Sequence, residues 1–398
     1  MDDAEDPVAI IISSNHAGHT IPGYFPYNVA KAGLGGLVQP LAVERGPDVR
    51  AVGIAPGFID TPINEEWFST FDDPAASSAA PRSWRTAGVP RPCRTAHAMS
   101  MTATCVLDAT ATLGEGPLWD PRRDHLWWVD IVAGELHAYD PVADRDTVLN
   151  VGEMIGAVGL QKGGGLVAAL EHGFATIDPD TGRVQHLQDP EADRPENRFN
   201  DGTCGPRGDG TCGPRGRFWA GTMARDGTPE QGSLYCLDPD GSVERKVSNV
   251  TISNGLAWDA SKGRIYYVDT PTQCVSAFDY APDTGTISNR RIAVHIPEAQ
   301  GAPDGLTIDA DGMLWVAHWG GACVGRWNPE TGERSATVEV PATQVSSCAF
   351  GGADRDQLFI TTAWEGLSDD ALAEQPLAGG LFRVEPDVRG GPVHVFDE

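Results

Sequence analysis

Four short segments place polar side chains where an apolar run is about to begin. Glu115 lies in LGEGPLWD, Asn254 in ISNGLAWD and Asp304 in APDGLTID, while Arg198 and Asn200 share NRFNDG. Glycines on both sides of Glu115 let the backbone turn and leave a carboxylate on a segment otherwise bound for a core. Carboxylate and amide oxygens suit Ca²⁺, Mg²⁺ or Mn²⁺ and tolerate Zn²⁺ or Fe²⁺. Glu115, Asn254 and Asp304 are therefore candidate ligands for one divalent cation.

Turn chemistry offers an alternative reading of the same residues. Asn-Gly and Asp-Gly pairs are the commonest hairpin signals, so each pair taken singly is more typical of a turn than of a ligand. Glu115 follows no turn rule, and the set taken together favours a site. His172 and His318 are candidates for the mouth of such a site, but a lone histidine is more often packed or solvated.

A repeat explains how residues so far apart could meet. Apolar-aromatic cores begin at residues 126, 166, 218, 265, 314 and 358, at intervals of 40 to 52 residues, and a turn built on Asp-Pro or a relative follows each. Several short strands per period predict an all-β, six-bladed β-propeller, in which equivalent positions of different blades converge on one axis. A β-sandwich with regular turns is the alternative, and the agreement of two markers on the number six disfavours it.

The first hundred residues have a different pattern. Apolar runs at 8–12 and 49–54 flank a helical stretch at about 26–45, which predicts an incomplete α/β, Rossmann-like fragment. Residues 72–97 are rich in Pro, Ala, Ser and Arg and have neither period. We therefore expect a fragment over 1–71, a linker over 72–100 and the propeller over 101–398.

Charge and hydropathy limit the classes of molecule that the chain can bind. The formal charge is −27, which repels nucleic-acid backbones and anionic membrane surfaces. No apolar run is long enough for a membrane span, and the first residues are acidic where a signal peptide is basic. These features predict a cytoplasmic protein that binds neither nucleic acid nor membrane.

From about residue 105 to 395 the chain resembles the senescence marker protein 30 (regucalcin) and gluconolactonase family. The motifs that carry the resemblance are GEGPLWD, NRFNDG, GRFWAGTM, ISNGLAWD, PDGLTID and LWVAHWGG. It implies a propeller that binds one divalent metal cation and hydrolyses a sugar lactone to the aldonic acid. Glu115, Asn254 and Asp304 match the family's metal ligands, and Arg198 and Asn200 match residues that hold substrate hydroxyls. Asp226 matches a substrate-contacting acid that is often the longer Glu.

The chemistry agrees with this resemblance. A metal ion can polarise a lactone carbonyl and lower the pKa of bound water. A nearby carboxylate can then accept and return the proton. Asp304 is our candidate for that base. A covalent serine mechanism is disfavoured because the propeller has neither a Ser-His-Asp order nor a GxSxG elbow. A non-catalytic, calcium-binding propeller is the alternative function.

Residues 5–65 resemble part of the short-chain dehydrogenases. Ser14, Tyr27 and Lys31 stand at that family's catalytic spacing. Tyr27 and Lys31 would share a helix face, where the lysine lowers the pKa of the phenol. The Gly-rich dinucleotide turn and the acidic ribose contact are missing. The motif is therefore interpreted as vestigial, and a complete dehydrogenase is excluded.

One octapeptide is repeated in tandem. DGTCGPRG at 201–208 is followed by an identical copy at 209–216. Its Gly and Pro residues oppose a strand, so we expect the extra copy to lengthen a hairpin connection. The pair Cys204 and Cys212 then reflects duplication, with a thiol site as the less favoured alternative. The eight scattered cysteines lack CxxC spacing and are predicted to be reduced packing residues.

Overall fold

The structure is a computed structural model that describes residues 8–12, 50–54, 99–206 and 216–397. The chain divides into two compact units, Met1–Cys93 and Arg94–Glu398. In the first, β1 (Val8–Ile12) and β2 (Arg50–Ile54) pair in parallel, with Val8 opposite Arg50. Both predicted strands are therefore present. The predicted helix at 26–45 and the residues Ser14, Tyr27 and Lys31 lie outside the described residues.

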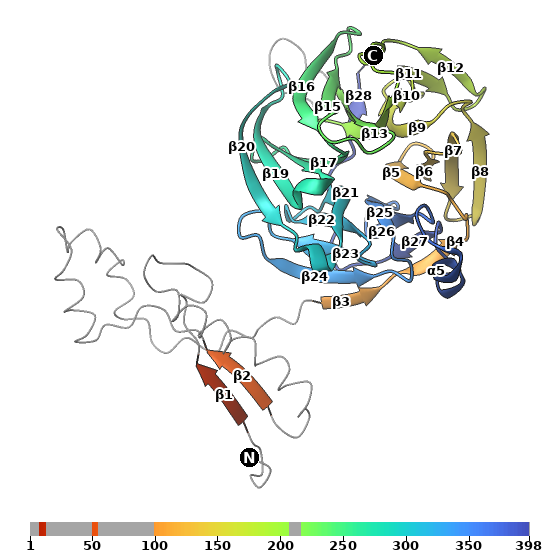
Figure 1. Cartoon of the computed structure of the whole chain (residues 1–398). Helices are drawn as coiled ribbons and strands as arrows, with labels where there is room; N and C mark the ends of the chain where they lie inside the picture. The colour runs from red at the N-terminus through yellow and green to blue at the C-terminus, as the bar shows by residue number, and fades with distance from the viewer. Residues whose placement is uncertain (1–7, 13–49, 55–98, 207–215, 398) are drawn as a thin grey trace, which may run out of the picture. The chain divides into compact units, whose positions relative to one another are not determined.

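The described part of the second unit is a six-bladed β-propeller, as predicted (Figure 1). The four-stranded sheets run antiparallel from the axis outward. Blade one contains β5 (Gly114–Asp120), β6 (His125–Asp130), β7 (Glu135–Asp140) and β8 (Arg145–Asn150). Blade two contains β9 (Ile155–Gln161), β10 (Leu166–Leu170), β11 (Gly173–Asp178) and β12 (Arg183–His186). Blade three contains β13 (Asn197–Cys204), β14 (Phe218–Ala224), β15 (Gly232–Leu237) and β16 (Val243–Val250).

The remaining blades follow the same order. Blade four contains β17 (Ser253–Asp259), β18 (Arg264–Asp269), β19 (Cys274–Ala281) and β20 (Thr286–His295). Blade five contains β21 (Ala302–Ile308), β22 (Leu314–Trp319), β23 (Cys323–Trp327) and β24 (Arg334–Glu339). Blade six contains β25 (Val345–Gly351), β26 (Gln357–Thr362) and β27 (Leu381–Val384). Short helical turns η3 (Thr270–Thr272), η4 (Glu298–Gln300) and α5 (Asp369–Glu374) lie in the connections.

Strands from the two ends of the unit complete the ring. The outermost strand of blade six is β4 (Thr104–Leu107), which pairs antiparallel with β27. The preceding strand, β3 (Met99–Thr102), adds in parallel to β24 of blade five. At the other end, β28 (Val395–Phe396) pairs in parallel with the innermost strand β9. Sequence-distant strands therefore close the ring and leave no gap between the first and last blades.

Burial along the blades explains the sequence pattern. Strands near the axis are packed on both faces, and every residue of β9 and β10 is buried. Outer strands such as β8 alternate between exposed and half-buried residues. Aromatic side chains fill the space between blades, and the Phe174 and Phe199 rings lie 4.7 Å apart. Burial of each such ring contributes on the order of 2 kcal/mol, which holds neighbouring blades in register.

The Asp-Pro turns are stabilised by their own side chains. Asp140 Oδ1 accepts hydrogen bonds from the backbone amides of Val142 and Ala143, both over 2.9 Å. Asn328 plays the same part in blade five by accepting from the Glu330 amide over 2.8 Å. The repeated sequence marker is therefore a repeated turn-forming bond.

The duplicated octapeptide begins inside a strand and ends in the connection after it. Asp201–Cys204 of the first copy form the end of β13, and Cys204 pairs with Phe218 at the start of β14. The second copy falls between these paired ends, and residues 207–215 are outside the described residues. The paired strands thus keep a continuous hairpin, as the loop interpretation requires. Within the described residues, no helix has the length and apolar character needed to cross a membrane.

Candidate active site

Each of four innermost strands carries a β-bulge near its start, and Glu115, Asn200, Asn254 and Asp304 lie at these bulges. The pairing register shifts between Glu115 and Leu118 in β5 and between Phe199 and Asp201 in β13. It also shifts after Asn254 in β17 and between Pro303 and Leu306 in β21. A bulge turns a side chain away from the regular alternation of a strand. Glu115, Asn200, Asn254 and Asp304 are thereby directed toward one end of the axis, where all four are buried.

The other two blades supply small residues at the same level. Gly156 in β9 leaves no room for a side chain, because an added Cβ would lie 2.8 Å from the Phe199 backbone. Ser346 in β25 donates its hydroxyl hydrogen to the carbonyl of Gly114, the residue before Glu115. Blades two and six therefore close the ring around the polar cluster without adding a charge.

The glycines after Asn254 and Asp304 serve close packing. Both pairs lie inside innermost strands, so the hairpin-turn alternative is wrong for them. An added Cβ on Gly255 would lie 2.6 Å from the Asp304 carbonyl oxygen, and one on Gly305 would lie 2.1 Å from Ser347 Oγ. Neighbouring innermost strands approach so closely at the axis that only glycine fits.

A chain of hydrogen bonds links blades three, four and five. Arg198 Nη1 donates to Asn200 Oδ1 over 2.7 Å. Asn200 Nδ2 in turn donates to Asn254 Oδ1 over 2.8 Å. Asn254 Nδ2 donates to Thr270 Oγ1 over 2.8 Å, and the Thr270 hydroxyl donates to the Pro303 carbonyl over 2.9 Å. Every amide orientation in the cluster is therefore fixed by a neighbour.

Three carboxyl groups share this buried space. Burial, followed by repulsion from Asp304 and Asp201, raises the pKa of Glu115 well above its usual range. Burial and repulsion from Asp201 likewise raise the pKa of Asp304. Burial raises the pKa of Asp201 to about 7. Like charges in a low-dielectric space destabilise one another, so a nearby cation would favour their ionised forms.

The oxygen atoms of the cluster fit a divalent cation. Asp304 Oδ1 is buried and has no hydrogen-bond partner among the described residues. Glu115 Oε2 accepts from the Gly116 amide over 2.9 Å, so Oε1 is left for another partner. Across the described ranges, no three His, Cys, Asp or Glu side chains are arranged to hold a metal, and the predicted ligand set combines two carboxyl groups with the amide oxygen of Asn254. An all-oxygen donor set of this kind suits hard cations.

Asp201, which follows Asn200 in the polar segment NRFNDG, lies near the predicted metal-binding carboxyl groups. It is 7% exposed and lines a cavity among the innermost strands, and its Oδ1 accepts from the Gly202 amide over 2.6 Å. The signal was present in NRFNDG, where Asp201 follows Asn200 on an innermost strand.

Asp226 and the two histidines lie apart from the hydrogen-bonded cluster. Asp226 is exposed in the turn after β14, and its carboxylate accepts from the Thr228 amide over 2.9 Å. His172 is exposed in the turn after β10. His318 is fully buried, its Nδ1 is 2.8 Å from the Gln300 carbonyl, and Trp327 Nε1 donates to its Nε2 over 3.3 Å. The interpretation of His318 as a packed residue is confirmed.

Comparison with known proteins identifies relatives of the propeller. The family described as SMP-30/Gluconolactonase/LRE-like region matches residues 113–364. A protein named "Putative sugar lactone lactonase YvrE" from Bacillus subtilis (strain 168) is 37% identical over 290 residues, which cover 73% of this chain and 97% of that protein. Regucalcin from Xenopus laevis is 38% identical over 72% of this chain and 94% of its own length.

A solved structure extends the likeness to three dimensions. The calcium-binding protein regucalcin from Agrobacterium tumefaciens superposes with a TM-score of 0.70 at 29% identity, over 75% of this chain and 98% of its own. Residues 4–100 match a separate family, described as Enoyl-(Acyl carrier protein) reductase, which agrees with the dehydrogenase-like segment. Through its propeller, the chain belongs to the SMP-30/gluconolactonase/LRE-like family.

Proposed function

We propose that the propeller hydrolyses a sugar lactone to the aldonic acid, with a divalent cation held by Glu115, Asn254 and Asp304. The observation that carries the proposal is the convergence of four bulge residues from four blades on one buried, oxygen-rich cluster. The chain's similarity to a protein named as a sugar lactone lactonase supports the same reaction. A bound cation would supply a Lewis acid for the lactone carbonyl and lower the pKa of the attacking water.

The side chains at the mouth would hold the substrate. Arg198 is half-buried, and Asn200 lies directly beside it, so both can meet ring hydroxyls while Asn200 keeps its bond to Asn254. Asp226 would have to leave its Thr228 contact to reach the same ring. The variant Asp226→Ala tests whether Asp226 contacts the substrate. A raised KM is the expected result.

Asp304 is proposed as the general base. The oxygen of its carboxylate that does not hold the cation can take a proton from water as the water oxygen bonds to the carbonyl carbon. The bond between the carbonyl carbon and the ring oxygen then breaks, and the proton passes to that ring oxygen. The products are one carboxylic acid and one hydroxyl on the opened chain, so the added water accounts for every atom.

The decisive experiment is lactone hydrolysis with controlled metal content. The full chain, treated with EDTA and dialysed, is assayed on a panel of aldonolactones before and after addition of Ca²⁺, Mg²⁺, Mn²⁺ or Zn²⁺. We expect turnover that disappears with EDTA and returns with at least one cation. Turnover that is unaffected by chelation would contradict the metal-dependent mechanism.

A non-catalytic, calcium-binding propeller is the second candidate. The same oxygen donors suit Ca²⁺, and a structurally similar relative is described as calcium-binding. Calorimetric titration with Ca²⁺ separates the two functions when it is run beside the lactone panel. Tight Ca²⁺ binding without turnover of any lactone would favour this second function.

A further inference from the structure

A cavity of about 120 Å³ lies on the propeller axis directly beneath the carboxyl cluster. Its walls are the residues that follow the cluster residues on the same strands: Gly116 after Glu115, Asp201 after Asn200, and Leu256 shortly after Asn254. The cluster and the cavity are therefore two levels of one axial channel. A single water needs roughly 10 to 15 Å³ of such a volume, so the cavity can hold several waters.

Polar side chains face this cavity from several blades. Asp201, Thr203, Thr307, Ser347 and His394 all line it. Four of these side chains have no hydrogen-bond partner within the described chain, namely Thr203, Thr307, Ser347 and His394. Their polar atoms are nevertheless not sealed off from solvent by protein atoms. These groups face space that admits a water-sized sphere. Buried polar groups in such a space are normally satisfied by ordered water.

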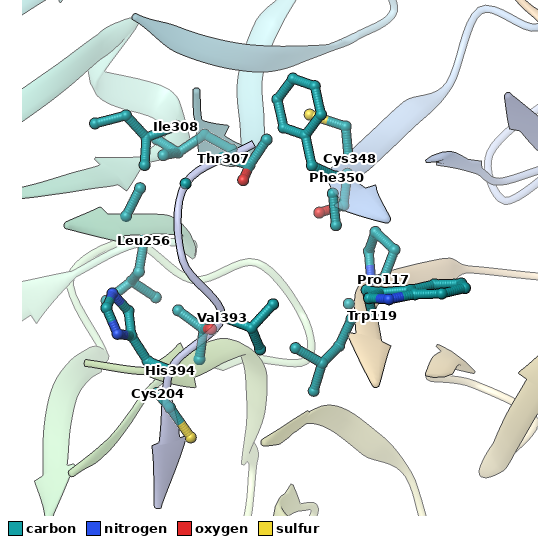
Figure 2. Close-up of a pocket in the computed structure, with 18 of the residues that line it drawn as sticks. Pro117, Trp119, Cys204, Leu256, Thr307, Ile308, Cys348, Phe350, Val393 and His394 are labelled. Carbon is teal, nitrogen blue, oxygen red and sulfur yellow. The ribbon is translucent and has the colours of Figure 1, made fainter. Parts of the chain in front are cut away.

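The C-terminal segment crosses the end of the channel opposite the cluster. Figure 2 shows Val393 and His394 on the irregular segment that leads into β28 and passes beside Thr307 and Leu256. The Gly391 amide bonds to the Ile308 carbonyl over 3.0 Å on one side of the axis. On the other side, β28 pairs with β9 and the Asp397 amide bonds to the Gly216 carbonyl over 3.1 Å. The segment is thus fixed at both ends and narrows the channel without filling it.

We propose that this lower channel is a water-binding passage that connects the face crossed by residues 391–394 to Asp201, beneath the carboxyl cluster. This inference rests on the proposed hydrolysis. A lactone held by Arg198 and Asn200 covers the cluster from the mouth, so replacement water reaches it from below. Asp201 is then a positioning residue, since it orients water toward the cluster and does not touch the substrate.

Electrostatics suit His394 to such a passage. Burial lowers the pKa of His394 to about 4, so the imidazole is neutral near pH 7. A neutral imidazole donates from one nitrogen and accepts at the other, and therefore continues a chain of waters in either direction. The cavity lining beside it is mixed, with Leu256 and Val393 as apolar neighbours. Water in this passage would be ordered by the few polar groups and mobile between them.

The test narrows the passage without touching the cluster. Ala349 lines the cavity from β25, and Ala349→Leu fills part of it. Thr307→Val removes one hydroxyl at constant shape. Ala293→Leu, on the outer strand β20, adds the same volume away from the axis and is the matched control. We expect kcat to fall about tenfold in Ala349→Leu and about threefold in Thr307→Val, with KM unchanged within about twofold.

A high-resolution crystal structure of the full chain provides the second readout. Ordered waters bonded to Asp201, Thr307 and Ser347 are expected in the wild type, and fewer in Ala349→Leu. A dry cavity, or channel variants with the wild-type kcat, would overturn the passage. If the wild type hydrolyses no lactone, the proposed function fails by itself, and the crystallographic waters still decide whether the passage binds water.

Discussion

Asn200 Nδ2 lies 2.8 Å from Asn254 Oδ1, and this hydrogen bond joins two innermost strands that are 54 positions apart in the chain. The side-chain amide of Asn254 is thereby assigned two proposed tasks, which are to bind the cation and to hold Asn200 in place. In the proposed site, Asn254 would offer the same oxygen to the cation, while Asn200 accepts a hydrogen bond from Arg198. The positions of substrate and cation would then be coupled through these two side chains.

The ligand assignment predicts a loss of activity without a loss of fold. Asp304→Ala or Asn254→Ala should lower kcat/KM at least about 100-fold, because each removes a cation ligand. The blades keep their cores, and Asp304→Ala also removes one of three mutually repelling carboxyl groups. Lactone assays at saturating metal and thermal melts measure the two effects. Glu333→Ala, in the exposed turn between β23 and β24, is the control, and wild-type turnover in both site variants would refute the assignment.

Arg198 is predicted to act mainly through substrate binding. Its Nη1 donates to the Phe199 carbonyl over 3.0 Å and to Asn200, which leaves other guanidinium hydrogens for the lactone. Lysine cannot reproduce the planar, forked arrangement of N–H donors in a guanidinium group. Arg198→Lys should raise KM about tenfold, roughly 1.4 kcal/mol, with a smaller change in kcat. Arg183→Lys on the exposed strand β12 should match the wild type, and an unchanged KM in Arg198→Lys would remove Arg198 from the substrate site.

Residues 1–98 are predicted to be dispensable for hydrolysis. A chain of residues 99–398 retains β3 and β4, so blade six keeps its outermost strand and the ring stays closed. Its kcat and KM should equal those of the full chain. A chain that starts at residue 108 lacks β4 and should melt at a lower temperature, because the last blade is incomplete. Loss of activity in the 99–398 chain while its propeller remains folded would contradict the prediction.

The duplicated octapeptide is predicted to leave the site intact. Deletion of residues 209–216 should preserve the pairing of Cys204 with Phe218, since Gly208 then precedes Arg217 as Gly216 does now. The deletion leaves five of the 13 residues between Cys204 and Phe218. This more than halves the loop and lowers its closure cost by at least about 0.6 kcal/mol, so a slightly higher melting temperature is expected. The measurement is kcat/KM on the best lactone before and after deletion. A gain of more than about tenfold would show that the extra copy distorts the site.

His318 should make stability depend on pH in the acidic range. Burial lowers the pKa of His318 in the folded chain to about 4, below its ordinary 6.5. Between these values the unfolded chain takes up a proton that the folded chain does not, so stability is full above about pH 6.5 and falls as the pH approaches 4. The contribution is on the order of 3 kcal/mol at most.

Melting temperatures of the wild type and His318→Gln between pH 7 and pH 4.5 test this dependence. The variant is less stable at pH 7 because it loses packing against Trp327, but the difference should shrink as the pH falls. A difference that stays constant across the range would show that His318 does not titrate as described. The comparison is made between the two chains because other buried groups titrate in both.

The sequence by itself determined the blade count and the candidate residues. Repeated strand cores and Asp-Pro turns report on local structure, where a turn side chain bonds its own backbone and an apolar run forms a strand. Glu115, Asn254 and Asp304 were recognisable because each interrupts such a run. These signals depend on near neighbours in the chain, and a sequence displays near neighbours directly.

Tertiary structure decided what those signals mean in space. Asn254-Gly255 reads as a hairpin turn in sequence, yet it is a bulge in β17, where Gly255 fits against the Asp304 carbonyl of the next blade. Asp201 is buried near Glu115 and Asp304, which lie far away in sequence, and burial raises its pKa to about 7. The C-terminal segment crosses the axis because β28 pairs with β9, more than two hundred residues earlier. Contacts between strands from different blades follow from ring closure, and no local pattern encodes that closure.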